Sequence, residues 1–215
     1  MAGLDPAPPS HYIPLDMEKL ATRGRPREFD VDQALAAALS VFWTKGYEGA
    51  SLTDLTEAMG ITRPSLYAAF GNKEELFKQA LDLYESEKLS YVKGALEAPT
   101  ARGVVERFLE GAIGNVAGGS CRGCLGVIAS VNCSNPDSPI RAEVLARAES
   151  SRAAIRQRMQ RAIDEGDFLV PVDAEAITRY MTTVMQGLSV QASAGASVEE
   201  LQEVAKAALA MWPSK

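Results

Sequence analysis

Three cysteines close together are the residues of this chain best suited to covalent or metal chemistry. Cys121 and Cys124 form a CxxC pair, and Cys133 follows shortly after. Thiols at this spacing can form a redox couple or half of a zinc site. The sequence has no second CxxC, and its one histidine is His11 in the N-terminal tail, so four ligands for one ordered zinc ion are not available. We therefore favour structural thiols, and a thiol-based redox or electrophile sensor that uses these cysteines stays open as the alternative.

No other combination of residues predicts catalysis. The sequence has no GxSxG nucleophile motif and no glycine-rich phosphate loop. A thiol-disulfide oxidoreductase needs its CxxC in a strand-helix setting, which a helical chain does not offer. We expect a protein that is not an enzyme and that has no metal and no cofactor.

A second group of residues, around 62–70, has the chemistry of a surface that binds DNA. Leu66 and Phe70 lie four residues apart and form an apolar stripe, whereas the other side of this short helix is small or polar and carries no acid. Such a face can enter a major groove, where acidic groups would meet phosphate. Arg63 and Ser65 are candidates for contacts with base edges, and Ala68 is a candidate for contact with a thymine methyl group.

Four further residues are candidates for contacts with the DNA backbone. Thr62, with the free amides at the start of its helix, predicts an anion site for a phosphate, and Lys73 begins the next helix as a point charge. Thr53 begins the preceding helix. Arg25 lies in the basic arm 23–27, which can reach the adjacent minor groove or the phosphates.

Start and stop signals divide the region around these residues into short helices. Ser51 with Asp54 predicts a capped helix over about 52–59, which Gly60 ends. A second helix follows to Phe70, and a third is predicted from 73 to 90 or 93. A longer helix over about 31–45 supplies the platform behind them. Helices this short need each other's apolar faces for stability.

The segment GYEGASLTDLTEAMGITRPSLYAAFGNKEELF, at 46–77, resembles the N-terminal domain of the TetR/AcrR family of bacterial transcriptional regulators. The resemblance covers about Arg25 to Leu83. It implies that Tyr67 contacts a phosphate, and it implies an all-α fold with a three-helix helix-turn-helix head and a larger helical domain for ligand binding and dimerisation. We expect a tail and the start of the basic arm at 1–24, the head at 25–71 and the second domain at 72–215.

The function that the resemblance implies is a ligand-responsive, sequence-specific regulator of transcription. We expect a homodimeric repressor that a small molecule releases from a palindromic double-stranded DNA operator. A non-specific architectural DNA binder is a further alternative.

The second domain is predicted to contain helices over about 104–116, 140–165 and 174–192 and a last helix after Ser197. The arginines of the 140–165 helix recur around several faces among acids, which predicts local ion pairs rather than a second nucleic-acid surface. Apolar and aromatic residues of the middle helices are candidates for a ligand pocket, although each is also compatible with an ordinary core. These candidates are Phe108, Val116, Leu125, Ile128, Met159, Tyr180 and Met185.

The last two helices carry apolar residues on more than one side, which favours a four-helix bundle across a two-fold axis. The alternative is that they complete the core of a single chain. The candidates for dimerisation are Ile177, Met181, Val184, Leu188, Leu201, Ala205, Ala208 and Trp212.

Charge and hydropathy limit where the protein acts. The net charge of -6 argues against a uniformly basic nucleic-acid binder, so a DNA surface must be local. The first twenty residues do not resemble a signal peptide, and no stretch of about 18 apolar residues occurs. We expect a cytoplasmic protein that does not enter a membrane, with Met17 as an alternative start to Met1.

Overall fold

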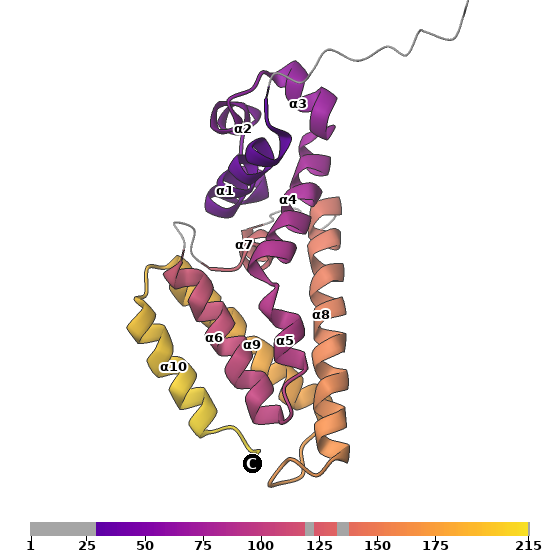
Figure 1. Cartoon of the computed structure of the whole chain (residues 1–215), viewed down its shortest axis with the longest axis vertical. Coiled ribbons are helices and arrows are strands. Elements are labelled where there is room, and N and C mark those ends of the chain that lie inside the picture. The colour runs from indigo at the N-terminus through magenta and orange to yellow at the C-terminus, as the bar shows by residue number, and fades with distance from the viewer. Residues whose placement is uncertain (1–28, 119–122, 133–137, 215) are drawn as a thin grey trace, which may run out of the picture.

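The computed structural model describes residues 29–118, 123–132 and 138–214, and this part of the chain is helical without a strand (Figure 1). The all-α fold class is therefore confirmed. The helices are α1 (Val31–Gly49), α2 (Leu52–Met59), α3 (Arg63–Phe70), α4 (Lys73–Lys88), α5 (Tyr91–Leu96), α6 (Ala101–Ala117), α7 (Leu125–Asn132), α8 (Pro139–Asp164), α9 (Ala174–Ser193) and α10 (Val198–Ala210). None of them is long and apolar enough to cross a membrane.

The predicted cap at the start of α2 is confirmed, and α4, which packs on α1 and is counted with the head from here on, begins with a cap of the same kind. Ser51 and Asp54 exchange side-chain and backbone hydrogen bonds at the start of α2, and Asn72 and Glu75 do the same at the start of α4. Each pair satisfies two backbone N–H groups that the first helical turn leaves free. Gly60 ends α2 with a φ of 65°, a left-handed conformation that glycine adopts at low cost.

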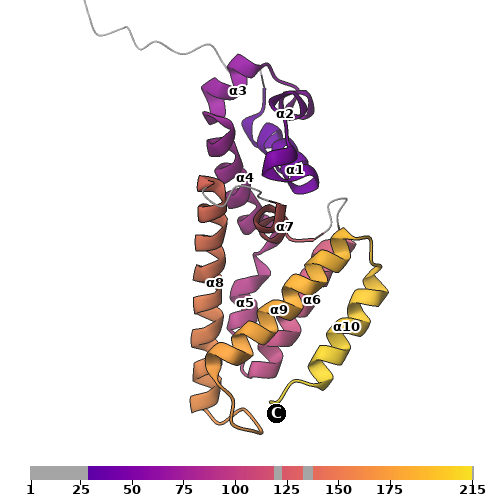
Figure 2. The ribbon, with the colours of Figure 1, turned by 180° about the vertical axis from the view of Figure 1, so that it is seen from behind.

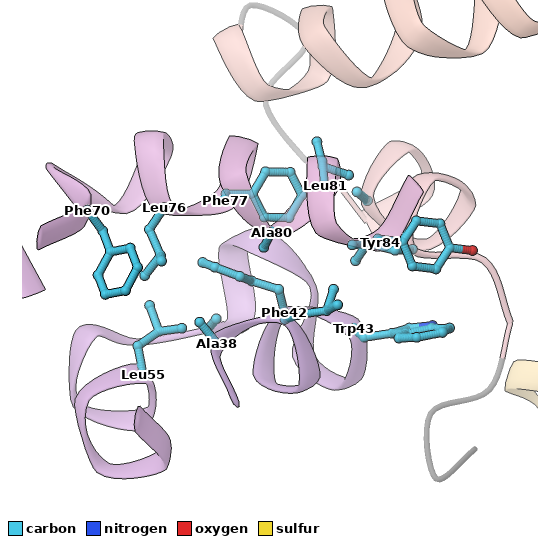
Figure 3. Packing of buried hydrophobic residues seen from close by; sticks show 14 of the residues in the cluster. Ala38, Phe42, Trp43, Leu55, Phe70, Leu76, Phe77, Ala80, Leu81 and Tyr84 are labelled. Atoms are coloured by element: carbon cyan, nitrogen blue, oxygen red, sulfur yellow. The ribbon is translucent and has the colours of Figure 1, made fainter. Parts of the chain in front are cut away.

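The first hydrophobic core lies between α1 and α4, with α2 and α3 closing one end (Figure 3). Phe42 of α1 and Phe77 of α4 meet edge to face with ring centroids 4.9 Å apart, and both are fully buried. Leu55 and Leu66 join them from the short helices. This core also includes Leu125 and Ala129 of α7 and Ile140 and Val144 of α8, so it extends beyond the helix-turn-helix segment.

The predicted third helix is interrupted. α4 ends at Lys88, and α5 begins at Tyr91 after a short break. The side-chain amide of Asn115 in α6 donates to the carbonyl oxygen of Lys88 over 2.6 Å, and this bond satisfies an acceptor at the end of α4. Asn115 lies far from the break in sequence, so local sequence patterns do not display this contact.

The second hydrophobic core joins α5, α6, α8, α9 and α10. Its fully buried members include Val104, Met159, Met181 and Leu201. The prediction for the arginines of α8 is confirmed for most of them, because arginines 147, 152, 156 and 161 form ion pairs with glutamates. Arg158 differs: it is buried and donates to the carbonyl oxygen of Ala98 over 2.7 Å.

The structure places the dimerisation candidates inside a single chain. Except for Val184, which is partly buried, the candidates named above are buried within the monomer. Six of them belong to the second core: Ile177, Met181, Leu188, Leu201, Ala205 and Trp212. They therefore cannot offer a large apolar surface to a second chain. The large apolar side chains that are exposed on α9, on α10 and directly after α10 are Tyr180, Val190, Val204 and Met211.

Candidate nucleic-acid interface and internal cavity

The side of α3 that faces away from the first core forms an exposed, acid-free surface. Leu66 and Phe70 anchor α3 in the core, with exposed fractions of 0% and 2%. Arg63, Tyr67 and Ala68 lie on the opposite side and are exposed, with Tyr67 at 50%. Because α3 contains no acidic residue, this side can approach phosphates without like-charge repulsion.

Two of the candidate DNA contacts meet where α2 and α3 begin. The guanidinium of Arg63 donates to the hydroxyl oxygen of Thr53 over 2.9 Å. Both side chains are exposed, so the contact lies at the surface and brings a donor and a hydroxyl from two helices together. If Arg63 contacts a phosphate or a base, its guanidinium either gives up the bond to Thr53 or keeps it and uses its other N–H groups.

The sequence predicts an anion site at the start of α3, and the structure leaves few backbone N–H groups free there to bind an anion. The Thr62 hydroxyl accepts from the backbone N–H of Ser65 and lies 3.0 Å from the Ser65 hydroxyl. Pro64 has no N–H, so the capping leaves the amide of Arg63 as the free donor of the first turn. Thr62 is exposed and Ser65 is partly buried, which leaves both hydroxyls near the surface.

Lys73 is held against an aromatic ring at the edge of the same surface. Its ammonium lies 4.4 Å from the ring centroid of Tyr47, which itself packs against Phe42 and Phe77. Burial lowers the pKa of Lys73, and the nearby Glu48 carboxylate partly opposes this shift. The cation–π contact fixes the direction of a side chain that is otherwise flexible.

Two further observations complete the head. Arg25 lies outside the described residues, so its role stays a prediction. Lys45 was not among the candidates, and it forms a 2.5 Å ion pair with Asp54 at the start of α2. Hydrogen bonding from Lys45 and from Ser51 holds the pKa of Asp54 well below its usual range.

Two cavities lie between the head and the helices of the second core. The smaller, of about 110 Å³, and the larger, of about 270 Å³, share a wall that includes Tyr84, Tyr91, Cys124 and Met185. Of the ligand candidates, Phe108, Val116 and Met185 line one or both cavities.

The other four ligand candidates lie elsewhere. Leu125 and Met159 are fully buried, and Ile128 packs against the first core. Tyr180 stacks on Trp212 at 6.2 Å. None of the four lines either cavity.

Two tyrosines that the sequence analysis did not single out face the Cys124 thiol within these walls. Burial raises the pKa of the Tyr84 hydroxyl, and the neighbouring Cys124 raises it further. Burial and Cys124 likewise raise the pKa of Tyr91 to about 12. Both phenols are therefore protonated at neutral pH and act as hydrogen-bond donors. The i, i+7 spacing of two tyrosines is the one sequence signal that these residues offered.

A junction beside the cavities links the head to the second core. The indole N–H of Trp43 in α1 donates to the carbonyl oxygen of Gly123 over 3.1 Å, and its ring meets that of Tyr84 edge to face at 4.9 Å (Figure 3). The next residue, Cys124, donates its backbone N–H to the hydroxyl of Ser189 in α9 over 2.6 Å. Tyr84, Gly123, Cys124 and Ser189 all line the smaller cavity.

Known proteins resemble this chain over both of its parts. Residues 34–80 match the family model for bacterial regulatory proteins of the tetR family, and residues 99–208 match that for the tetracyclin repressor-like C-terminal domain. The HTH-type transcriptional repressor ComR of Escherichia coli (strain K12) is 33% identical over 196 residues, which cover 89% of this chain and 93% of ComR. The HTH-type transcriptional repressor BdcR of the same organism is 34% identical over 83% of this chain and 86% of BdcR.

Among solved structures, a cysteine-substituted form of the TetR family transcriptional regulator CifR, complexed with 26-bp double-strand operator DNA, superposes with a TM-score of 0.82. It is 42% identical and covers 88% of this chain and all of its own. The chain therefore belongs to the TetR family of bacterial transcriptional regulators.

Proposed function

We propose that this protein is a homodimeric repressor that binds a palindromic operator and releases it when a small molecule enters the second domain. The observation that carries the proposal is the acid-free, exposed side of α3, held outward by the burial of Leu66 and Phe70. The named relatives ComR and BdcR, which are transcriptional repressors, support this function.

In the proposed complex, α3 lies in the major groove. Arg63, Ser65 and Ala68 meet base edges, and Tyr67 donates to a phosphate. Thr53, Thr62, Lys73 and the arm residue Arg25 contact the DNA backbone and set the orientation of the head. The complex of CifR with operator DNA supports binding to DNA by a chain of the same fold.

The homodimer is proposed to form through the outer sides of α9 and α10, which lie next to each other on one face (Figure 2). Tyr180 and Val190 of α9 and Val204 and Met211 at the end of α10 are 36% to 69% exposed there. These residues replace the buried positions that the sequence pattern suggested. A symmetric dimer brings two α3 helices to half-sites about 34–36 Å apart.

We propose that ligand binding releases the operator because the cavities lie beside the contact between Trp43 and Gly123, which joins the head to the second core. A ligand that binds two arrangements of this junction with different affinity shifts the population between them. The protein then regulates without turning over a substrate, and it acts in the cytoplasm, where bacterial DNA lies. The repressor relatives do not favour the thiol-sensor alternative, for which Cys121 and Cys133 lie outside the described residues.

Selection of bound fragments from the source genome tests the proposal. We expect recovery of a pseudo-palindromic sequence that the protein prefers over random duplex by about 10³ or more at physiological salt. A preference below about tenfold would instead indicate an architectural DNA binder. The genes beside the recovered site identify the regulated operon.

A further inference from the structure

The hydroxyl of Tyr91 is a hydrogen-bond donor inside the cavities that makes no hydrogen bond to the described residues. Tyr84 differs, because its hydroxyl is more deeply buried and the neighbouring Cys124 raises its pKa. Since the Tyr91 phenol makes no hydrogen bond to the described residues, it is available to donate to a bound molecule that carries an acceptor atom.

The ring of Tyr91 is fixed in place by its surroundings. A Cβ atom on Gly111 of α6 would lie 2.2 Å from this ring, so the ring packs directly on the backbone of α6. The ring of Phe108 meets it edge to face at 6.1 Å. The hydroxyl group is therefore held in one place, which is what a binding site requires of its donor.

The other polar groups of the smaller cavity are already engaged or lie at its rim. The Asn115 amide donates to the Lys88 carbonyl oxygen, and the Ser189 hydroxyl accepts from the Cys124 amide. Gln186 is exposed on α9. The remaining walls are mostly apolar, with Leu89, Ile113, Val116, Val127 and Met185 among them. Tyr91 thus stands in these walls as a donor that makes no hydrogen bond to the described residues.

The cavities have no free charge to offer a ligand. The smaller cavity has no charged lining residue, and the larger has Glu85, Arg147 and Arg152. Arg147 is shared by Asp82 at 2.7 Å, Glu85 at 3.2 Å and Glu143 at 2.7 Å, and Arg152 pairs with Glu149 at 2.8 Å. Both lining arginines already pair with acidic side chains, and Glu85 already pairs with Arg147, so neither an anionic nor a cationic ligand has an unpaired counter-charge in the cavity walls.

From this geometry, and resting on the ligand-responsive function proposed above, we infer the class of the effector. It is a neutral, largely apolar molecule of one or two rings that carries a hydrogen-bond acceptor, and this acceptor receives the proton of the Tyr91 hydroxyl. The size follows from the cavity volumes of about 110 and 270 Å³, given that a dry cavity of about 150 Å³ holds benzene.

Three matched probes test the inference on the full chain without DNA. Acetophenone is neutral with a carbonyl acceptor, ethylbenzene has a similar shape without an acceptor, and benzoate is an anion. Calorimetric titration is expected to show the tightest binding for acetophenone and at least tenfold weaker binding for benzoate. In Tyr91→Phe, which keeps the ring, the affinity for acetophenone should fall about three- to tenfold, whereas that for ethylbenzene should stay unchanged.

Ser86→Ala is the control, since it removes an exposed hydroxyl that lies outside both cavities and should alter neither affinity. Circular dichroism checks that both variants are folded. The inference is wrong if none of the probes binds, if benzoate binds as tightly as acetophenone, or if Tyr91→Phe changes the affinities for acetophenone and ethylbenzene equally. Binding without any effect on operator affinity would instead count against the proposed function and leave the inferred ligand class intact.

Discussion

In the proposed complex, Lys73 and Tyr67 both contact phosphates, and the salt dependence of binding distinguishes the charged contact from the neutral one. Lys73, oriented by Tyr47, carries a charge, whereas Tyr67 is neutral and exposed. A charged phosphate contact releases counterions, so its removal changes the salt dependence of binding; a neutral donor contributes a hydrogen bond without this effect.

We therefore predict different outcomes for two substitutions. Lys73→Ala should weaken binding to all sequences and reduce the slope of log affinity against log salt by about one. Tyr67→Phe should weaken binding about two- to tenfold and leave that slope unchanged. Fluorescence anisotropy at several salt concentrations measures both. Lys93→Ala, an exposed lysine of α5, is the control, and an equal loss in that variant would contradict the assignment.

The sequence predicted whether a side chain is buried or exposed where that depends on the spacing within a single helix. The spacing of Leu66 and Phe70 correctly predicted the buried side of α3, and thereby the exposure of Arg63, Tyr67 and Ala68. It did not predict the site of Tyr91, because that ring is placed by Gly111, twenty residues further along the chain.

Among the elements, α7 is preceded by Gly123, which packs closely against α9. Gly123 has a φ of 86°, and a Cβ atom there would lie 2.2 Å from the Ser193 hydroxyl oxygen and 2.8 Å from the Ser189 carbonyl oxygen. No residue other than glycine fits this conformation and this contact without a shift of α9.

Gly123→Ala should therefore lower the free energy of unfolding by about 1–3 kcal/mol. Gly114→Ala in α6 is the matched control, because a Cβ atom there meets no atom within 4 Å, and it should raise stability by up to about 1 kcal/mol. Urea denaturation followed by circular dichroism compares the two variants. Equal stability of the Gly123 variant and the parent chain would show that the loop is free to rearrange.

Helix starts were predictable from sequence and the break after α4 was not. The caps at Ser51, Thr62 and Asn72 act within three residues, so the sequence displays them directly. The end of α4 at Lys88 depends on Asn115, and no local pattern marks it.

For the whole molecule, the proposed homodimer determines how tightly the two heads together bind an operator. The double variant Val190→Glu with Val204→Glu places charges on the exposed sides of α9 and α10 without touching either core. We predict a folded monomer by light scattering, with operator affinity at least about 100-fold weaker because the second head no longer contributes. Leu169→Glu, at 66% exposure in the α8–α9 connection, should remain dimeric. If the double variant remains a dimer, the interface does not lie on these sides of α9 and α10.

The assembly also shows where pattern analysis stops. The apolar residues on more than one side of α9 and α10 favoured a dimer interface, yet most of the predicted interface residues pack within one chain against α6 and α8. A helix with apolar residues on two sides does not reveal which side its own chain covers. That choice depends on the neighbours, which only the fold supplies.

The extent of the first core limits how this regulator can be recombined with others. Leu125 and Ala129 of α7 and Ile140 and Val144 of α8 pack into the same core as Phe42 and Phe77. A fragment cut after α4 would leave that apolar surface open to water. A head transferred from a relative therefore has to offer side chains that pack against α7 and α8. Changes in the DNA specificity of the head and in the ligand response of the second domain are consequently coupled.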